Sequence, residues 1–310
     1  MNGPQNIDAP EDRPILATHT SRLSLIACVA LLVVLGFALR PSNVQAAWAE
    51  LEKIIGLKSQ PLPASPAILS EHEIEDLGSQ PPQQQAELLL ERSVSHYSGA
   101  IELLSERVGG WCGQLKRTPR LLSLLETAMN SNDLRVRAAA IEVYLALDNI
   151  PKAPDNISIV LVPRLGEGGA SRYWALWMVG GLGNRGIEPD HAFSILDDYL
   201  RDPDEMTRYW AVEGMAMLGS DNTIQPLLDV FHSDPSPKVR ERAACSLAQS
   251  GMLTKDQRMT AVPKIIDFLD DASVDASTRG WAVQALNDIT TAGLGPDPAA
   301  WRNWWAQHHS

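Results

Sequence analysis

Apolar stretches with a helical period alternate with short polar turns along residues 118–290. Within each stretch the apolar residues recur every three or four positions, as on an amphipathic helix. The turns are rich in Asp, Ser, Pro and Gly, which end one helix and cap the next. The pattern therefore predicts five units of helix, tight turn and helix. The first helices are expected at 120–129, 157–166, 191–200, 224–233 and 262–271.

The expected second helices repeat one motif. SRYWALWMVGGLG at 171–183 is followed by TRYWAVEGMAMLG at 207–219, and three more copies lie at 134–147, 239–251 and 278–290. Every copy has an arginine near its start and an alanine three positions later. The aligned arginines are Arg137, Arg172, Arg208, Arg240 and Arg279. A single helical pair cannot bury its own apolar face, so repeated pairs are expected to stack into a solenoid.

The two fixed residue types have a structural explanation. Alanine at a repeated position allows neighbouring second helices to approach closely. The arginines stand beside turn carboxylates such as Asp133, Asp204 and Asp275. We expect them to pair with these or to hydrogen-bond to the next repeat, as a ladder that sets the angle between repeats and performs no chemistry.

This pattern resembles HEAT repeats, particularly the short type also found in phycobilisome lyases. The resemblance rests on the turn aspartates, on Val136-Arg137 and Val239-Arg240, and on the alanine three positions further on. It covers about 118–290, with Ser171 and Thr207 replacing the usual valine in two copies. It implies an all-α fold, an α-solenoid of the armadillo/HEAT-like α-α superhelix type. It implies little about activity, because a fold does not determine function.

An uncharged run, LSLIACVALLVVLGFAL, occupies residues 23–39 after a tail at 1–22. It is at the lower length limit of a transmembrane helix and is longer than the usual core of a signal peptide. We expect an uncleaved single-pass membrane anchor, with a cleaved signal or a buried core helix as alternatives. The arginine count on its two sides is tied. A periplasmic or other extracytoplasmic position for the larger part is therefore a default expectation.

The remaining segments are expected to connect and cap the array. Prolines in 41–82 indicate a tether. An apolar stripe in 83–117 predicts a long helix or a helical pair that caps the first repeat, with a coiled-coil seam as the alternative. The last stretch, 297–307, predicts a capping helix with Trp301, Trp304 and Trp305 on one face.

Aromatic residues recur two positions after the aligned arginines, as Trp174, Trp210 and Trp281. Tyr173, Tyr209 and Trp177 neighbour this column. These six residues either fill volume between repeats or form an aromatic strip on the concave face that binds a protein partner, since Trp and Tyr are frequent in binding hot spots. Solvent exposure of the rings distinguishes the two interpretations.

Composition excludes several other functions. The chain has a net charge of -12 and lacks the basic region that nucleic-acid-binding domains usually show, so we expect no nucleic-acid partner. The His-Glu pair His72-Glu73 lies before the repeats, and no spacing suggests a metal or cofactor site. Cys112 and Cys245 are interpreted as unpaired thiols, with one bridge between them as the alternative.

We therefore expect a non-catalytic scaffold or assembly factor. The alternative is a lyase-like enzyme or chromophore chaperone that uses the same groove and Cys112 or Cys245.

Overall fold

The computed structural model describes residues 67–308, which lie within one compact unit. The expected tail and anchor, 1–22 and 23–39, lie outside the described residues. Within the described part all regular elements are helical, and the β contact is an isolated bridge between Ile68 and Ser98. None of its helices is long and apolar enough to cross a membrane. The all-α prediction is confirmed for this part of the chain.

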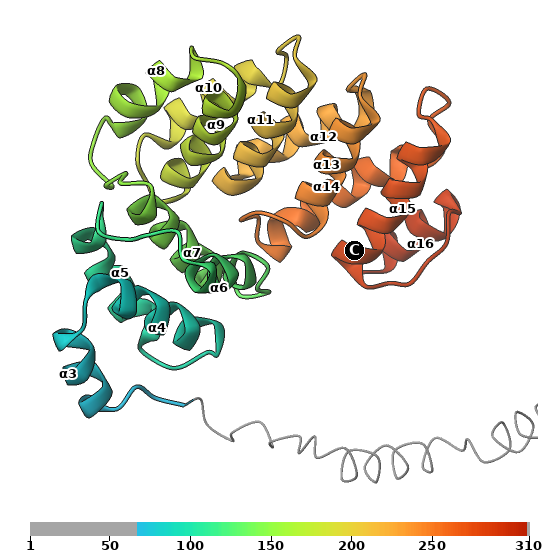
Figure 1. The fold of residues 1–310 in the computed structure, drawn as a ribbon. Coiled ribbons are helices and arrows are strands. Elements are labelled where there is room, and N and C mark those ends of the chain that lie inside the picture. The colour runs from blue at the N-terminus through green and yellow to red at the C-terminus, as the bar shows by residue number, and fades with distance from the viewer. Residues whose placement is uncertain (1–66, 309–310) are drawn as a thin grey trace, which may run out of the picture. The chain divides into compact units, whose positions relative to one another are not determined.

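Five helical pairs follow one another between residues 118 and 290, where the repeat predicts them (Figure 1). The pairs are α6 (Pro119–Met129) with α7 (Leu134–Leu147), η2 (Ile157–Leu161) and α8 (Val162–Leu165) with α9 (Gly169–Asn184), α10 (Pro189–Tyr199) with α11 (Glu205–Leu218), α12 (Ile224–Ser233) with α13 (Pro237–Ala248), and α14 (Lys255–Asp267) with α15 (Ala276–Thr290). A short 3-10 turn, η3 (Asp221–Thr223), leads into α12. The arrangement fits an α-solenoid.

Turn aspartates start three of the second helices. The side chains of Asp133, Asp204 and Asp275 accept hydrogen bonds from backbone N–H groups in the first turns of α7, α11 and α15. These N–H groups have no partner within the helix, so a capping oxygen stabilises the helix start. The polar turns therefore fix where each second helix begins.

The first helix of the second pair differs from the prediction. Residues 157–166 were expected as one helix, but they form the π-helical turn η2 followed by the four-residue helix α8. Pro163 stands in the first turn of α8, where a residue without an N–H loses no intrahelical hydrogen bond and favours the start of a helix. The second repeat has the shortest α-helix among the first helices.

The segment before the repeats contains more helix than predicted. Part of the expected tether forms α3 (Glu71–Ser79), which starts with a capping box between Ser70 and Glu73. The apolar stripe is divided between α4 (Pro82–Val94) and α5 (Ala100–Arg107), with a final 3-10 turn η1 (Val108–Trp111). The chain reverses between α4 and α5, with Gly99 in the left-handed region (φ 84°). The stripe is therefore a helical pair that packs on α6 and α7.

A further helix, α16 (Pro298–His308), follows the last pair and packs against α14. Trp301 is fully buried there, and its indole N–H donates to the carbonyl of Gly295. The apolar surface at this end of the array is partly covered in this way, as expected for a capping helix.

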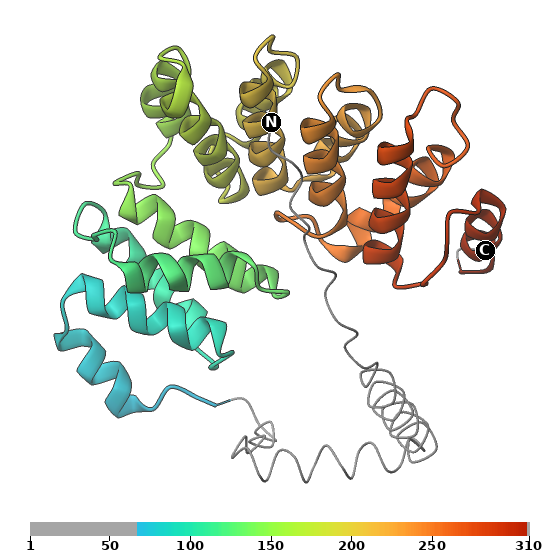
Figure 2. The same cartoon turned by 45° about the vertical axis from the view of Figure 1, so that its right-hand side comes forward.

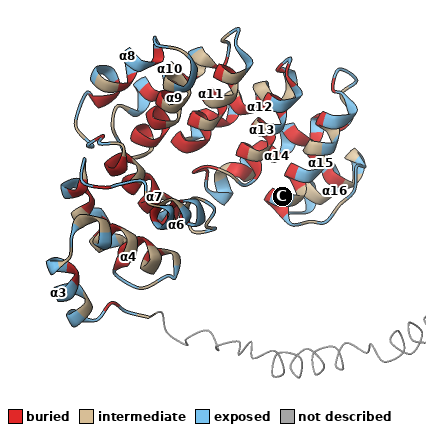
Figure 3. Cartoon of the chain, viewed as in Figure 1, coloured by how far each residue is buried: buried red, intermediate tan, exposed pale blue. Residues whose placement is uncertain are grey.

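Two hydrophobic clusters run through the described residues, and helix α7 contributes to both. Val136, Ala140 and Val143 face the cluster formed with α3–α6, whereas Ile141 and Leu145 face the cluster of the later repeats. Buried positions lie where helices pack on their neighbours (Figure 3). Helix α7 thus joins the amino-terminal cap to the rest of the array.

Helices α9 and α11 approach each other unusually closely, at Gly180 and Gly214. A Cβ atom added to Gly180 would lie 2.1 Å from the carbonyl oxygen of Gly214. The crossing therefore requires glycine. The repeated alanines Ala175 and Ala211 are also buried here, and the glycines permit an approach that a Cβ atom would block.

The helical pairs of the described part stand side by side in a curved row (Figures 1 and 2). Helices α9, α11, α13 and α15 contact one another in sequence along this row. Their side chains form the surface on which the candidate site lies.

Candidate functional site

The five aligned arginines share one local role. Each guanidinium donates a hydrogen bond to a backbone carbonyl at the end of the first helix or in the turn of its own repeat. The donor–acceptor pairs are Arg137 to Ser131, Arg172 to Leu165, Arg208 to Asp202, Arg240 to Asp234 and Arg279 to Asp271. Carbonyls at a helix end have no partner within the helix, so the arginines satisfy them and complement the helix dipole.

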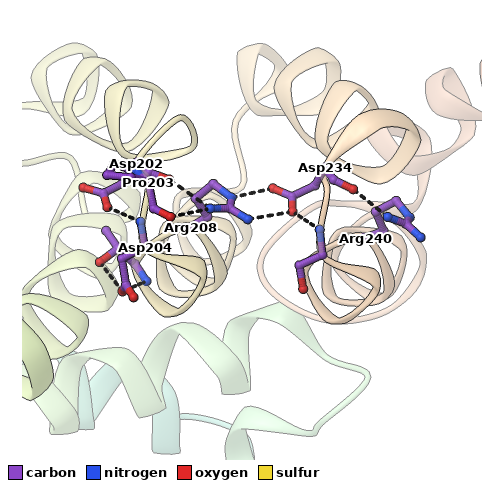
Figure 4. Close-up of polar contacts among 8 residues, drawn as sticks. Asp202, Pro203, Asp204, Arg208, Asp234 and Arg240 are labelled. Carbon is purple, nitrogen blue, oxygen red and sulfur yellow. Dashed lines mark hydrogen bonds and ion pairs between the residues drawn. The ribbon is translucent and has the colours of Figure 1, made fainter.

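Three rungs of this ladder also reach the next repeat. Nη1 of Arg172 lies 3.7 Å from Oδ2 of Asp202 in the third repeat. Figure 4 shows the next rung, Arg208 with Asp234. Nε and Nη2 of Arg208 donate to the two carboxylate oxygens of Asp234 at 2.8 and 3.1 Å. Both side chains are largely buried. Asp234 in turn accepts a hydrogen bond from Arg240 through its carbonyl, and Arg240 donates to Asp275 and Thr278 in the fifth repeat. The ladder thus connects the second, third, fourth and fifth repeats.

Arg137 departs from this pattern. Its Nη1 donates to the carbonyls of Gln249 and Gly251, which lie in the connection between α13 and α14. We call residues 249–254 the inner loop. Ordinarily each repeat of a solenoid contacts only its neighbours. Here the first repeat contacts the fourth.

The inner loop is held at its base by Arg258. This buried guanidinium donates to the carbonyls of Ser246, Leu247, Ser250 and Leu253. Burial and the nearby charge of Arg137 lower the pKa of Arg258 to about 10. Sequence analysis missed Arg258, because it has no counterpart in the other repeats.

A cavity of about 740 Å³ lies between α6, α7, α9, α11, α13 and the inner loop. We call it the aromatic groove. Its lining consists of Arg117, Leu122, Glu126, Met129, Asn130, Tyr144, Asp148, Ala170, Tyr173, Trp174, Trp177, Met178, Trp210, Glu213, Met217, Arg242, Ser250 and Gly251. The inner loop thus forms one wall of the groove, through Ser250 and Gly251.

Half-buried aromatic rings dominate the lining. Tyr144 and Trp177 meet edge to face with ring centroids 5.2 Å apart, and Tyr173 stacks on Trp210 at 6.3 Å. The indole N–H of Trp174 donates to Asp148 at 2.7 Å. These rings pack against neighbouring repeats and also face the cavity. The rings therefore fill volume between repeats and are also exposed to the cavity, so neither of the two interpretations is excluded by their position.

The structure brings together four of the six predicted aromatic residues. Tyr173, Trp174, Trp177 and Trp210 line the groove, whereas Tyr209 contacts the edge of Trp210 from outside the lining. Trp281 lies in a separate hollow of about 50 Å³ on the next part of the inner surface. Sequence analysis missed Tyr144, because it stands in a second helix but outside the aligned tryptophan column.

Two of the three carboxylates of the groove are paired with arginines. Nε of Arg242 lies 2.8 Å from Oε1 of Glu213, and Arg117 pairs with Asp148. Burial raises the pKa of Glu213, and the positive charge of Arg242 opposes that rise. Arg242 occupies the repeat position held by Trp174 and Trp210, so an ion pair replaces an aromatic ring there.

Comparison with known proteins agrees with this geometry. A family model described as HEAT repeats matches residues 160–248. Residues 160–248 are therefore similar to HEAT repeats, which supports a HEAT-like array. No curated protein matches the sequence significantly. Among solved structures, the chain is similar to a crystal structure of an engineered protein at 16% identity, with 67% of this chain and 98% of that chain covered. The TM-score of 0.31 is too low to establish a shared fold.

Both cysteines of the described residues lie outside the lining of the aromatic groove. Cys112 and Cys245 are both free thiols, so the alternative of a bridge between them is not observed. Burial raises the pKa of each thiol, which disfavours the reactive thiolate. The groove therefore contains neither of the nucleophiles that the lyase-like alternative would use.

Metal-ligating side chains do not cluster among the described residues. Within residues 67–308 no group of three or more His, Cys, Asp and Glu could hold a metal ion. His72 approaches Asp76 on α3, and Glu73 pairs with Arg92. The His-Glu pair noted in the sequence thus takes part in local ion pairs.

Proposed function

We propose that this chain is a non-catalytic scaffold or assembly factor that binds a protein partner in the aromatic groove. HEAT repeats commonly mediate protein–protein interaction, and stacked repeats create extended surfaces suited to it. The observation that carries the proposal is the lining of the groove. Tyr144, Tyr173, Trp174, Trp177 and Trp210 are only half-buried and face one cavity.

Paired charges support binding over catalysis. A general acid, base or nucleophile needs a titratable group free to exchange a proton or attack a substrate. In the groove, Glu213 and Asp148 are engaged by arginines, and the third carboxylate, Glu126, is exposed to solvent with no nucleophile or second catalytic group of the described residues paired with it. Half-exposed Trp and Tyr rings supply large contact area at low entropic cost, which suits a binding hot spot.

Affinity capture with a double variant tests the proposal. The part of the chain after residues 23–39 is used as bait, once as wild type and once as the double variant Trp174→Ala plus Trp210→Ala. The proteins bound to each bait are compared by quantitative mass spectrometry. We expect a specific set of partners to be lost with the double variant. Trp305→Ala is the matched control, because Trp305 is a half-buried tryptophan on α16 outside the groove. Equal recovery with all three proteins would exclude the groove as the binding site.

A cofactor or chromophore chaperone is the second candidate. The volume of the groove, about 740 Å³, falls within the range of small-molecule sites. Titration with biliverdin, followed by absorbance, separates the two functions. We expect no spectral shift. A saturable shift that is abolished by Trp174→Ala plus Trp210→Ala would favour the chaperone.

We further propose that residues 23–39 hold the scaffold at a membrane as a single-pass anchor, with the HEAT array on the extracytoplasmic side. The uncharged run in the sequence supports the anchor, and the side is the default for a single amino-terminal anchor whose flanking arginine count is tied. Alkaline carbonate extraction of membranes and protease protection of intact cells test attachment and side. Release into the carbonate supernatant would contradict the anchor.

A further inference from the structure

The carboxylates along the inner surface outnumber the arginines that could neutralise them. In the aromatic groove both arginines are paired, Arg117 with Asp148 and Arg242 with Glu213. Glu126, on α6, also lines the groove. It is exposed and forms no ion pair with any residue of the described part. The groove thus presents one negative charge beside its rings.

A second part of the surface has the same character. The hollow at Trp281, which we call the C-terminal hollow, is also lined by Glu241 and Asp288, among other residues of α13 and α15. Both carboxylates are exposed, and neither forms an ion pair within residues 67–308. An aromatic ring and two uncompensated negative charges therefore stand together.

The groove and the C-terminal hollow both border helix α13. Arg242 lines the groove, whereas Glu241 and Cys245 on the same helix line the hollow. One extended ligand can therefore contact both places.

A guanidinium of this chain already lies over one ring of the groove. Arg164 lies over the Trp174 ring, 4.7 Å from its centroid, and Arg117 is beside it. This face of Trp174 already carries a cation. The rings of Tyr144 and Trp177 and the ring of Trp281 have no cation of this chain stacked on them among the described contacts.

We propose that the partner occupies this surface with a basic peptide segment that presents two Lys or Arg side chains. One cation lies against Tyr144 and Trp177 beside Glu126, and the other lies against Trp281 between Glu241 and Asp288. Aromatic faces attract cations, and complementary charge gives the partner register and specificity. The net charge of -12 also favours approach of a basic partner. This inference rests on the proposed binding function and specifies the chemistry of the partner.

Short fluorescein-labelled peptides test the inference by fluorescence anisotropy. The peptides share one sequence except at two positions. Both positions carry lysine, norleucine or glutamate, which gives three series, and within each series the number of residues between the two positions is varied. We expect the lysine series to bind at least about tenfold more tightly than norleucine at the best spacing, with affinity falling as salt is raised. Equal or tighter binding of norleucine or glutamate, or no binding of any series, would overturn the inference.

Charge variants of the protein locate the contact. Glu126→Gln should weaken binding of the lysine peptide several-fold, and so should the double variant Glu241→Gln plus Asp288→Asn. Neither change should alter the affinity of the norleucine peptide. Glu106→Gln on α5 removes the same charge outside the groove and should leave affinity unchanged. A partner lost with Trp174→Ala plus Trp210→Ala but insensitive to these charge variants would overturn the basic segment and leave the proposed function standing.

Discussion

Arg137, in the second helix of the first repeat, donates a hydrogen bond of 2.5 Å to the carbonyl of Gly251 in the fourth repeat. The same nitrogen donates to Gln249 at 3.0 Å. Burial lowers the pKa of this guanidinium, and no carboxylate of the described residues pairs with it. Its charge is therefore stabilised by backbone carbonyls. Since Gly251 lines the aromatic groove, this contact holds one wall of the groove in place.

Arg137→Ala should loosen the inner loop and destabilise the array. The change leaves buried carbonyls without a donor, which costs about 3 kcal/mol of unfolding free energy. In hydrogen-exchange mass spectrometry, peptides containing Met252 should exchange faster, because its N–H is held by the carbonyl of Ala216. Arg279→Ala is the matched control, because it removes the aligned arginine of the fifth repeat, which donates to the carbonyl of Asp271. An unchanged exchange rate at Met252 would show that the loop holds its position without Arg137.

Gly180→Ala should strongly destabilise the contact between α9 and α11. The added methyl would collide with the backbone at Gly214, which cannot move as a flexible side chain would. We expect a loss of at least about 3 kcal/mol in urea unfolding followed by circular dichroism. Gly280→Ala, at an exposed position of α15 where an added Cβ meets nothing, should instead stabilise by about 0.5–1 kcal/mol. Similar effects of the two substitutions would contradict the close crossing.

Asp234→Asn tests the buried rung of the arginine ladder. The side chains of Arg208 and Asp234 are 10% and 3% exposed, so removing one charge leaves the other buried without a counter-charge. We expect a loss of about 3 kcal/mol, measured by thermal or urea unfolding. Asp270→Asn, which breaks an exposed pair with Arg302, should cost no more than about 0.5 kcal/mol. Equal losses would mean that the ladder is no stronger than a surface ion pair.

Asp204 should make stability depend on acid pH. Hydrogen bonds from the Thr207 side chain and backbone hold the pKa of this capping carboxyl below its ordinary value. Its contribution is therefore complete above the unfolded-state pKa, near about pH 4, and is lost as pH falls through the lower folded-state pKa. The stability difference between wild type and Asp204→Asn should be constant near neutral pH and shrink in acid. A difference that persists unchanged to low pH would show that the charge makes no contribution.

Local patterns in the sequence were sufficient to predict the repeated helical pairs. Helical periodicity and capping aspartates act over a few residues, and the pairs lie where these signals place them. The aligned arginines could be assigned a structural role because their main acceptors lie in the adjacent turn, as for Arg208 and Arg240.

Long-range geometry was beyond the sequence pattern. Contact of Arg137 with Gly251 depends on how repeats far apart in the chain are placed, which no local period encodes. The aromatic column grouped Trp281 with Trp174, but the direction of each ring depends on the angle of its helix, and Trp281 lies in a different hollow. Tyr144, in contrast, joins the groove without belonging to the column.

The inner loop changes the topology of contacts from a line into a ring. In an open line, cutting the chain between repeats leaves one interface to hold the pieces. Here a cut at Gly186, in the turn after α9, would leave two: the glycine crossing of Gly180 and Gly214, and the bond from Arg137 to Gly251. Two separately expressed halves divided at that turn would therefore recognise each other at two points and reassemble as a split protein.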